Sequence, residues 1–320
     1  MIKNKLSWMI GGSQGSGVDS AANMFARACG YSGLFVFGKR EYYSNIMGEH
    51  SYFSIRIGDR KIRSNLDKVN LLVTFDADTI VRHYDNITAD GGIIFDPKFG
   101  STRISQIQTL GTRLTTDVTE FLKNRGKGDA VSDLLDLCKE DGKKLYPIDY
   151  GSLLRELAEE NSELKLSQLN RVINIMAVSA SFGLLKFDFD LIEMAIKSIF
   201  SSKPKVAALN VIAAKKSYSR IGETHGRDFP FILEKVPVNE KRIFLTGNQA
   251  VALGKIIAGC RFQTYYPIAP ATDESVYLED KDTFGIVLPE VANQPQIEEA
   301  SILNGKGSIV VLQTEDEIAA

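Results

Sequence analysis

Residues 266–275, Tyr-Pro-Ile-Ala-Pro-Ala-Thr-Asp-Glu-Ser, form the part of this sequence best suited to contact a ligand. Two prolines three positions apart are disfavoured inside a helix or a central strand, so we expect a stiff extended loop. An apolar segment, residues 244–260, precedes this loop. In open α/β sheets ligands bind beyond the carboxyl ends of the strands, and we expect the loop to lie there.

An acidic segment follows the last apolar run. Residues 309–313 are typical of a buried strand, and Thr-Glu-Asp-Glu at 314–317 predicts a helix N-terminus with acids in its first turn. Only three residues follow Glu317. A helix this short does not stabilise itself, so we expect the polypeptide to be a fragment or one piece of a longer subunit.

A glycine-rich turn, residues 11–17, follows a short apolar strand near the N-terminus and precedes a helix. Free backbone N–H groups at a helix N-terminus favour a phosphate, so Gly12, Gly15 and Gly17 are candidate cofactor-binding residues. Their spacing matches neither the dinucleotide fingerprint nor a P-loop. A tight turn that lets the helix pack against the strand is the alternative.

The segment 39–53 is rich in basic, hydroxyl and aromatic side chains and could hold an acidic ligand or a partner; a solvated loop is the alternative. No Cys-x-x-Cys pair occurs and the histidines are isolated in the sequence, so no metal or iron-sulfur site is predicted. The residues concerned are Cys29, Cys138, Cys260, His50, His83 and His225.

Short β-rich runs alternate with helical stretches, which predicts an α/β fold with a mostly parallel or mixed sheet. We expect two domains, residues 1–200 and 241–320, the second apparently truncated. Residues 201–240 contain several prolines and glycines and are predicted as a linker.

Composition excludes several classes of protein. The net charge is −2 and hydrophobic residues make up 44 %, so no nucleic-acid footprint is expected. No apolar run approaches about 18 residues, which argues against a membrane span. Lone cysteines and the lack of a signal peptide predict a cytoplasmic location.

The proline loop resembles the Tyr-Pro-Ile-Thr-Pro substrate loop of the 2-oxoacid:ferredoxin oxidoreductases. These enzymes use thiamine diphosphate and coenzyme A to decarboxylate 2-oxoacids and reduce ferredoxin. Archaeal members fuse a gamma domain to an alpha domain. Residues 1–200 resemble the gamma domain, and residues from about 241 resemble the start of the thiamine-enzyme-like alpha domain.

The resemblance implies that the loop contacts the 2-oxoacid. The substrate-binding residues would be Tyr266, Pro267, Ile268, Ala269, Pro270 and Thr272. Ala269 stands where the family has a threonine that donates a hydrogen bond to the substrate. Losing such a bond costs roughly 1.5–3 kcal/mol, and Thr272 could offer a substitute hydroxyl.

The resemblance also implies a role for the acidic segment, in which Glu317 would be the catalytic carboxylate that activates thiamine diphosphate. Glu315 is the alternative. In the family, the Mg²⁺-diphosphate motif and the iron-sulfur cysteines belong to the beta subunit. Coenzyme A is a co-substrate, and the glycine turn would have a structural role or lie beside it.

Three hypotheses follow. The first is the alpha subunit of such an oxidoreductase, active with a beta subunit on a 2-oxoacid that the sequence does not identify. The second is a degenerate, non-catalytic scaffold, favoured by Ala269, by Gln249 where the family has glutamate, and by the early stop. The third is a nucleotide-binding protein built around the glycine turn.

Overall fold

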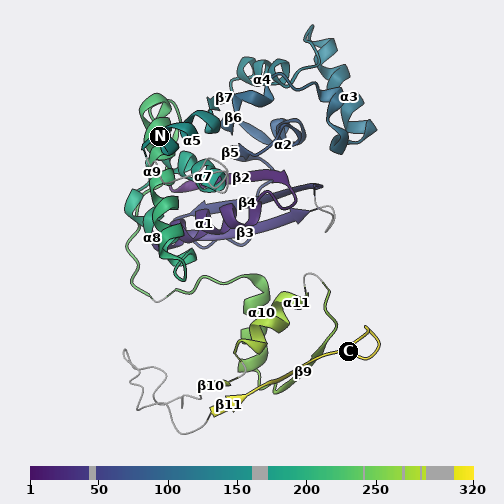
Figure 1. The fold of residues 1–320 in the computed structure, drawn as a ribbon, viewed down its shortest axis with the longest axis vertical. Coiled ribbons are helices and arrows are strands. Elements are labelled where there is room, and N and C mark those ends of the chain that lie inside the picture. Colours follow the sequence, from purple (N-terminus) through teal and green to yellow (C-terminus); the bar gives the residue numbers. More distant parts are fainter. Residues whose placement is uncertain (43–47, 161–171, 241, 269–270, 282, 286–305) are drawn as a thin grey trace. The chain divides into compact units, whose positions relative to one another are not determined.

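The computed structural model describes residues 1–42, 48–160, 172–240, 242–268, 271–281, 283–285 and 306–320. They form two compact units, Met1–Glu240 and Lys241–Ala320 (Figure 1). Each unit combines strands with helices, so the predicted α/β class is confirmed. None of the helices in these ranges is both long and apolar enough to span a bilayer.

The first unit is built on a six-stranded mixed sheet. Strands β2, β5, β6 and β7 are parallel to one another, whereas β4 runs antiparallel to β2, and the edge strand β3 runs antiparallel to β4. In spatial order the strands are β3 (Phe35–Tyr42), β4 (His50–Gly58), β2 (Lys5–Ser13), β5 (Val69–Thr74), β6 (Ile87–Phe95) and β7 (Lys144–Pro147).

Helices cover both faces of this sheet (Figure 1). Trp8 and Ile10 of β2 join one core and Met9 joins the other, as expected of a strand buried on both faces. One face carries α1 (Val18–Tyr31), α5 (Tyr150–Glu160), α7 (Ile173–Leu184), α8 (Phe189–Ile199) and α9 (Pro204–His225). The other carries α2 (Ala77–His83), α3 (Thr112–Asn124) and α4 (Val131–Glu140). Short 3₁₀ turns are Tyr84–Asn86, Pro97–Phe99, Ile104–Gln106 and Gln108–Leu110.

An aromatic stack fixes α1 and α7 against the central strand. The Trp8 ring lies 4.2 Å from the Phe25 ring, which in turn lies 4.6 Å from the Phe182 ring, measured between centroids. The buried Trp8 Nε1 donates a 3.0 Å hydrogen bond to Ser181 Oγ, so the indole is satisfied. The stack orients α1 and therefore the glycine turn that precedes it.

The predicted linker at 201–240 is wrong. Most of it forms α9, which packs along α7, while β8 (Phe231–Ile232) pairs with β1 (Ile2–Lys3). Ser217 Oγ donates a 2.7 Å hydrogen bond to Met176 O in the buried helix contact. Two of the residues that suggested a linker lie at the ends of this helix, Pro204 at its start and Gly226 just after it, whereas Gly222 lies inside it.

The second unit contains a two-stranded parallel sheet, β9 (Phe262–Tyr265) beside β12 (Val310–Gln313). A small core contains Ala252, Leu278 and Ile309. The remaining elements are α10 (Gly247–Ile257), α11 (Ala271–Glu279) and an antiparallel pair, β10 (Thr283–Gly285) with β11 (Lys306–Ser308). Thus residues 271–275, expected in the extended proline loop, instead form the first part of α11.

Two histidines far apart in the sequence meet inside the first unit. His50 begins β4 and His83 ends α2, and their Nε2 atoms lie 2.9 Å apart. One ring must therefore donate through Nε2 and the other accept, so at most one of the two can carry a proton on both nitrogens. Burial is the largest cause that lowers the pKa of each histidine to about 4. The charge of Asp78 opposes this for His50, whereas for His83 the charge of His50 lowers the pKa further and the hydrogen bond with Asn86 opposes the shift.

The helix crossing between α7 and α9 predicts opposite effects for two glycine substitutions. A Cβ on Gly183 would lie 2.5 Å from Ile221 Cγ2 and 2.6 Å from Tyr218 O, so Gly183→Ala should lower the free energy of unfolding by about 1–3 kcal/mol. Gly222→Ala meets only Gly183 O at 3.8 Å and should raise it by about 0.5–1 kcal/mol. Urea unfolding measures both, and equal signs would contradict this packing.

The histidine pair predicts acid sensitivity. Their pKa values are lower in the folded state than the usual 6.5, so unfolded chains bind more protons between pH 6.5 and about 4. The free energy of unfolding should fall as pH drops through this window, by at most on the order of 3 kcal/mol per histidine. His83→Gln should flatten this fall, and an unchanged slope in that variant would contradict the assignment of the acid sensitivity to the histidine pair.

Candidate functional site

The carboxyl edge of the first sheet contains a polar cavity of about 200 Å³. Strands β2, β5 and β6 end around it, and α1 begins beside it. Its lining comprises Ser16, Thr74, Phe75, Asp96, Lys98, Phe99, Tyr150, Ile173 and Asn174. Polar side chains thus gather where parallel strands end, which is the usual ligand position of an open α/β sheet.

Two buried hydroxyls in this cavity, Ser16 Oγ and Tyr150 OH, have no hydrogen-bond partner among the described residues. The buried Asp96 Oδ2 lies 3.0 Å from the exposed Lys98 ammonium and forms an ion pair with it. An unsatisfied buried polar atom costs about 1–3 kcal/mol, which a bound ligand or water would recover.

Tyr150 is poised to donate. Burial, followed by the nearby Asp96 charge, raises the pKa of Tyr150 well above its usual range, so the phenol keeps its proton. The cavity therefore offers a carboxylate acceptor and two hydroxyls within reach of an exposed ammonium. This set suits a ligand that has hydroxyl or amine groups.

The glycine turn lies against this cavity. Its backbone angles and close packing explain why glycine occupies these positions. Gly15 and Gly17 have φ angles of 91° and 92°, in the left-handed region that other residues avoid. A Cβ on Gly12 would lie 2.7 Å from Ser16 Oγ and 2.9 Å from Phe75 Cβ, while one on Gly17 would collide with the Asn174 amide. The Asn174 side chain therefore covers the start of α1.

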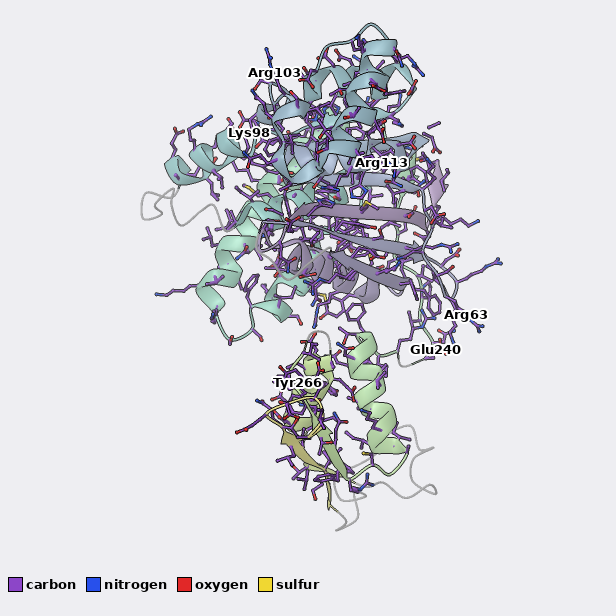
Figure 2. The ribbon with its side chains drawn as sticks, turned by 90° about the vertical axis from the view of Figure 1, so that its right-hand side faces the viewer. Arg63, Lys98, Arg103, Arg113, Glu240 and Tyr266 are labelled. Carbon is purple, nitrogen blue, oxygen red and sulfur yellow. The ribbon has the colours of Figure 1, made fainter. Side chains whose placement is uncertain are left out.

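In the second unit, parallel pairing brings the proline loop and the acidic segment to one edge. Tyr265 of β9 is in register with Gln313 of β12, and Thr314 N donates a 2.9 Å hydrogen bond to Tyr265 O. Residues 266–268 continue from β9, with Tyr266 half-buried (Figure 2). Segments about 50 positions apart thus leave the sheet side by side.

Individual loop residues differ in what the structure establishes. Pro267 and Ile268 are exposed, whereas Ala269 and Pro270 lie outside the described residues. Thr272 Oγ1 donates a 3.2 Å hydrogen bond to Ile268 O in the first turn of α11. To donate to a ligand this hydroxyl would have to leave that carbonyl, although it can still accept a hydrogen bond.

The predicted helix N-terminus at 314–317 is wrong, because the chain forms a bend and a turn there. Asp316 Oδ1 accepts a 2.7 Å hydrogen bond from Ala319 N, which closes the turn. The Glu317 side chain is exposed, and no hydrogen bond or ion pair involves it among the described residues.

Several polar residues were missed by sequence reasoning. Asp96 directly follows the β-rich run 92–95, so asking which polar residue follows each strand would have found it. Tyr150 and Asn174 arrive from helices, and no local pattern marks them. Within the described ranges, no group of three or more His, Cys, Asp or Glu side chains could hold a metal ion. The pair formed by His50 and His83 is therefore not part of such a group.

Comparison with known proteins identifies the family. Residues 7–220 match the family described as pyruvate ferredoxin/flavodoxin oxidoreductase. A 2-oxoacid:ferredoxin oxidoreductase subunit alpha from Saccharolobus solfataricus is 39 % identical over 99 % of this chain and 47 % of its own length. Its counterpart from Sulfurisphaera tokodaii is 37 % identical with the same coverage. The chain thus spans about half the length of the curated relatives it matches.

A solved structure shares the fold. The 2-oxoglutarate:ferredoxin oxidoreductase from Magnetococcus marinus, with 2-oxoglutarate, coenzyme A and succinyl-CoA bound, matches 99 % of this chain and 44 % of its own, with a TM-score of 0.67 and 21 % identity. The resemblance inferred from the proline loop is therefore confirmed at the level of the family. This chain belongs to the pyruvate ferredoxin/flavodoxin oxidoreductase family.

Proposed function

We propose that this chain is the alpha-subunit component of a thiamine diphosphate-dependent 2-oxoacid:ferredoxin oxidoreductase. With a beta subunit it would convert a 2-oxoacid and coenzyme A into an acyl-CoA and CO₂ while ferredoxin is reduced. The parallel pairing of β9 with β12 carries this proposal, because it gives the substrate loop and the acidic segment a common edge. We place the complex in the cytoplasm.

The substrate loop would orient the 2-oxoacid. Its prolines restrict the backbone, so little entropy is lost when a ligand binds. In the proposal Tyr266, Pro267, Ile268, Ala269, Pro270 and Thr272 contact the substrate. The exposed Pro267 and Ile268 leave this surface accessible to it and to the partner subunit.

Glu317 would accept a hydrogen bond from the aminopyrimidine ring of thiamine diphosphate. The carboxylate is exposed and has no competing partner among the described residues, so it fits that role. Thiamine diphosphate, when bound, supplies the carbon that attacks the 2-oxo group. The Mg²⁺-diphosphate contacts and the iron-sulfur cluster would belong to the beta subunit, as the resemblance implies.

The cavity beside the glycine turn would contact coenzyme A. Its volume of about 200 Å³ is below that of a whole-ligand pocket, so it would take one hydroxyl-bearing part of the molecule. The Asp96 carboxylate favours a hydroxyl over a phosphate there. Gly12, Gly15 and Gly17 would serve by letting the backbone turn tightly beside that group.

The alternative is a non-catalytic scaffold of the same family. Gln249 gives it less support than the sequence suggested, because Gln249 Oε1 accepts a hydrogen bond from Thr246 N and completes a capping box. An amide serves that position as well as a carboxylate. Ala269 remains the substitution that favours the scaffold.

Replacement of Glu317 tests the catalytic assignment. In the full-length subunit assembled with its beta subunit, Glu317→Gln should lower kcat about 10²–10⁴-fold with little change in KM, because the cofactor loses its activating carboxylate. Glu315→Gln is the matched control and should change kcat less than about twofold. The reverse pattern would move the role to Glu315.

Restoring the missing hydroxyl tests the enzyme against the scaffold. In the same assembled complex, Ala269→Thr should raise kcat/KM about tenfold or more, since a hydrogen bond to a charged substrate group contributes roughly 1.5–3 kcal/mol. Ala269→Val introduces a side chain of the same shape as threonine but without the hydroxyl, so it should not raise kcat/KM. An inactive complex in all three forms would favour the scaffold.

A further inference from the structure

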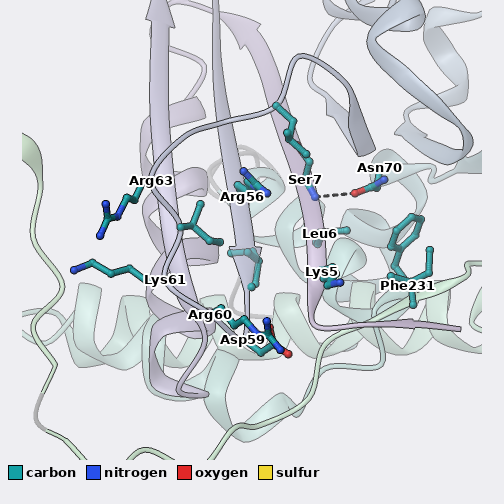
Figure 3. A pocket seen from close by; sticks show the side chains of 15 residues that line it. Lys5, Leu6, Ser7, Arg56, Asp59, Arg60, Lys61, Arg63, Asn70 and Phe231 are labelled. Atoms are coloured by element: carbon teal, nitrogen blue, oxygen red, sulfur yellow. Dashed lines mark hydrogen bonds between the residues drawn. The ribbon is translucent and has the colours of Figure 1, made fainter.

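A second, larger groove lies at the opposite end of the first sheet, where its parallel strands begin. It has a volume of about 690 Å³ and forms where β2 begins, where β4 ends, and under the chain that connects β4 to β5 (Figure 3). The buried side chains of Leu6 and Ile57 form an apolar part of its lining. This volume is typical of a site for a small organic ligand.

The groove is strongly basic. Five cationic side chains line it, with one acidic side chain beside them: Lys5, Arg56, Arg60, Lys61, Arg63 and Asp59. The whole chain has a net charge of −2, so this is a local concentration and not a general property of the surface. Cations lining a concave surface produce a positive potential that attracts anions.

Most of these cations are not neutralised by the protein. Among the residues that the structure describes, no ion pair involves Lys5, Arg60, Lys61 or Arg63, although exposed lysines elsewhere pair with acids. Lys61 and Arg63 extend toward the same side of their segment (Figure 3). Their mutual repulsion would be relieved by a multiply charged anion.

Arg56 links β4 to the connecting segment and still has donors available for a ligand. Its Nη1 donates a 3.2 Å hydrogen bond to Ser64 O, which ties the connecting segment back onto β4. A guanidinium has five N–H donors, so this one bond leaves several donors for a ligand. Arginine is well suited to bind phosphate, because its planar fork matches two phosphate oxygens.

We propose that this groove binds a small phosphorylated ligand, a phosphate or pyrophosphate group attached to an organic body of about nucleotide size. Five cationic side chains in one groove carry more positive charge than a single carboxylate would neutralise, and the apolar part of the lining suits the organic body. A single-stranded nucleic acid fits less well, because it requires exposed aromatic stacking surfaces and Phe231 in the lining is buried.

The inference does not rest on the proposed function. The groove is built from the start of β2, whereas the cavity with Asp96 and Lys98 lies at the carboxyl end of that strand. Figure 2 shows Lys98 and Arg63 on different sides of the first unit. Loss of ligand binding in the groove and loss of turnover by the assembled enzyme are therefore separate results.

The test is calorimetry of the 320-residue chain with inorganic pyrophosphate, ADP and coenzyme A. We expect ADP to bind with a dissociation constant below about 1 mM and to weaken steeply with added salt. Coenzyme A binding at least about tenfold tighter than ADP would identify the co-substrate as the source of the phosphate only if Lys61→Glu with Arg63→Glu weakens it about tenfold or more, because coenzyme A held at the cavity beside Asp96 would not respond to these residues. Equal affinity with the same dependence would identify a free nucleotide, and tight binding without that dependence would count against the groove.

Matched variants locate the binding. Lys61→Glu with Arg63→Glu should weaken ADP about tenfold or more, whereas Lys205→Glu with Lys215→Glu changes the net charge equally outside the groove and should weaken it less than about twofold. Asp59→Asn removes the acidic side chain from the groove and should tighten binding a few-fold. A purely structural role for these residues would not produce that gain.

Three results would overturn the proposal. The first is no measurable binding of pyrophosphate, ADP or coenzyme A at millimolar concentration. The second is equal weakening by the two double variants, which would mean that ADP responds to net charge alone. The third is binding of a single-stranded oligonucleotide more than about a hundredfold tighter than ADP, which would identify a macromolecular partner in place of a small ligand.

Discussion

Parallel strand pairing is the constraint on which both candidate sites depend. Parallel strands place their carboxyl ends at one edge, so the residues that follow each strand meet however far apart they are in sequence. In the first unit the glycine turn follows β2 and Asp96 follows β6. In the second unit Tyr266 follows β9 and Thr314 follows β12. One geometric rule therefore generates two clusters of polar side chains.

The two ends of the parallel strands in the first sheet differ in electrostatic character. At the carboxyl edge, Asp96 and Tyr150 are buried, so each contact there is strong but costs desolvation. At the other edge, Arg60, Lys61 and Arg63 are exposed and screened by water. The first edge suits recognition of a few hydrogen-bonding groups, and the second suits attraction of a charged ligand.

Sequence reasoning worked where the signal was local. The strand around Trp8 and the glycine turn after it are encoded within about ten residues, and the fold follows from such alternation. The linker prediction was wrong because Pro204 and Gly226 mark the start and the end of a helix, α9. That helix is buried against α7, which is a tertiary contact that the local sequence does not reveal. The histidine pair was missed for a similar reason, since β4 and α2 bring His50 and His83 together only in the folded chain.

The choice between an enzyme and a scaffold depends mainly on the side-chain hydroxyl that Ala269 lacks. Gln249 is explained by its capping box, so of the two substitutions only Ala269 removes a group that would touch substrate. The hydroxyl of Thr272 is engaged by Ile268 O and does not replace it without rearrangement. A missing hydrogen bond of roughly 1.5–3 kcal/mol slows an enzyme about 10- to 150-fold. Positioned carboxylates contribute factors of about 10²–10⁴, so a site that keeps its glutamate retains most of its catalytic advantage.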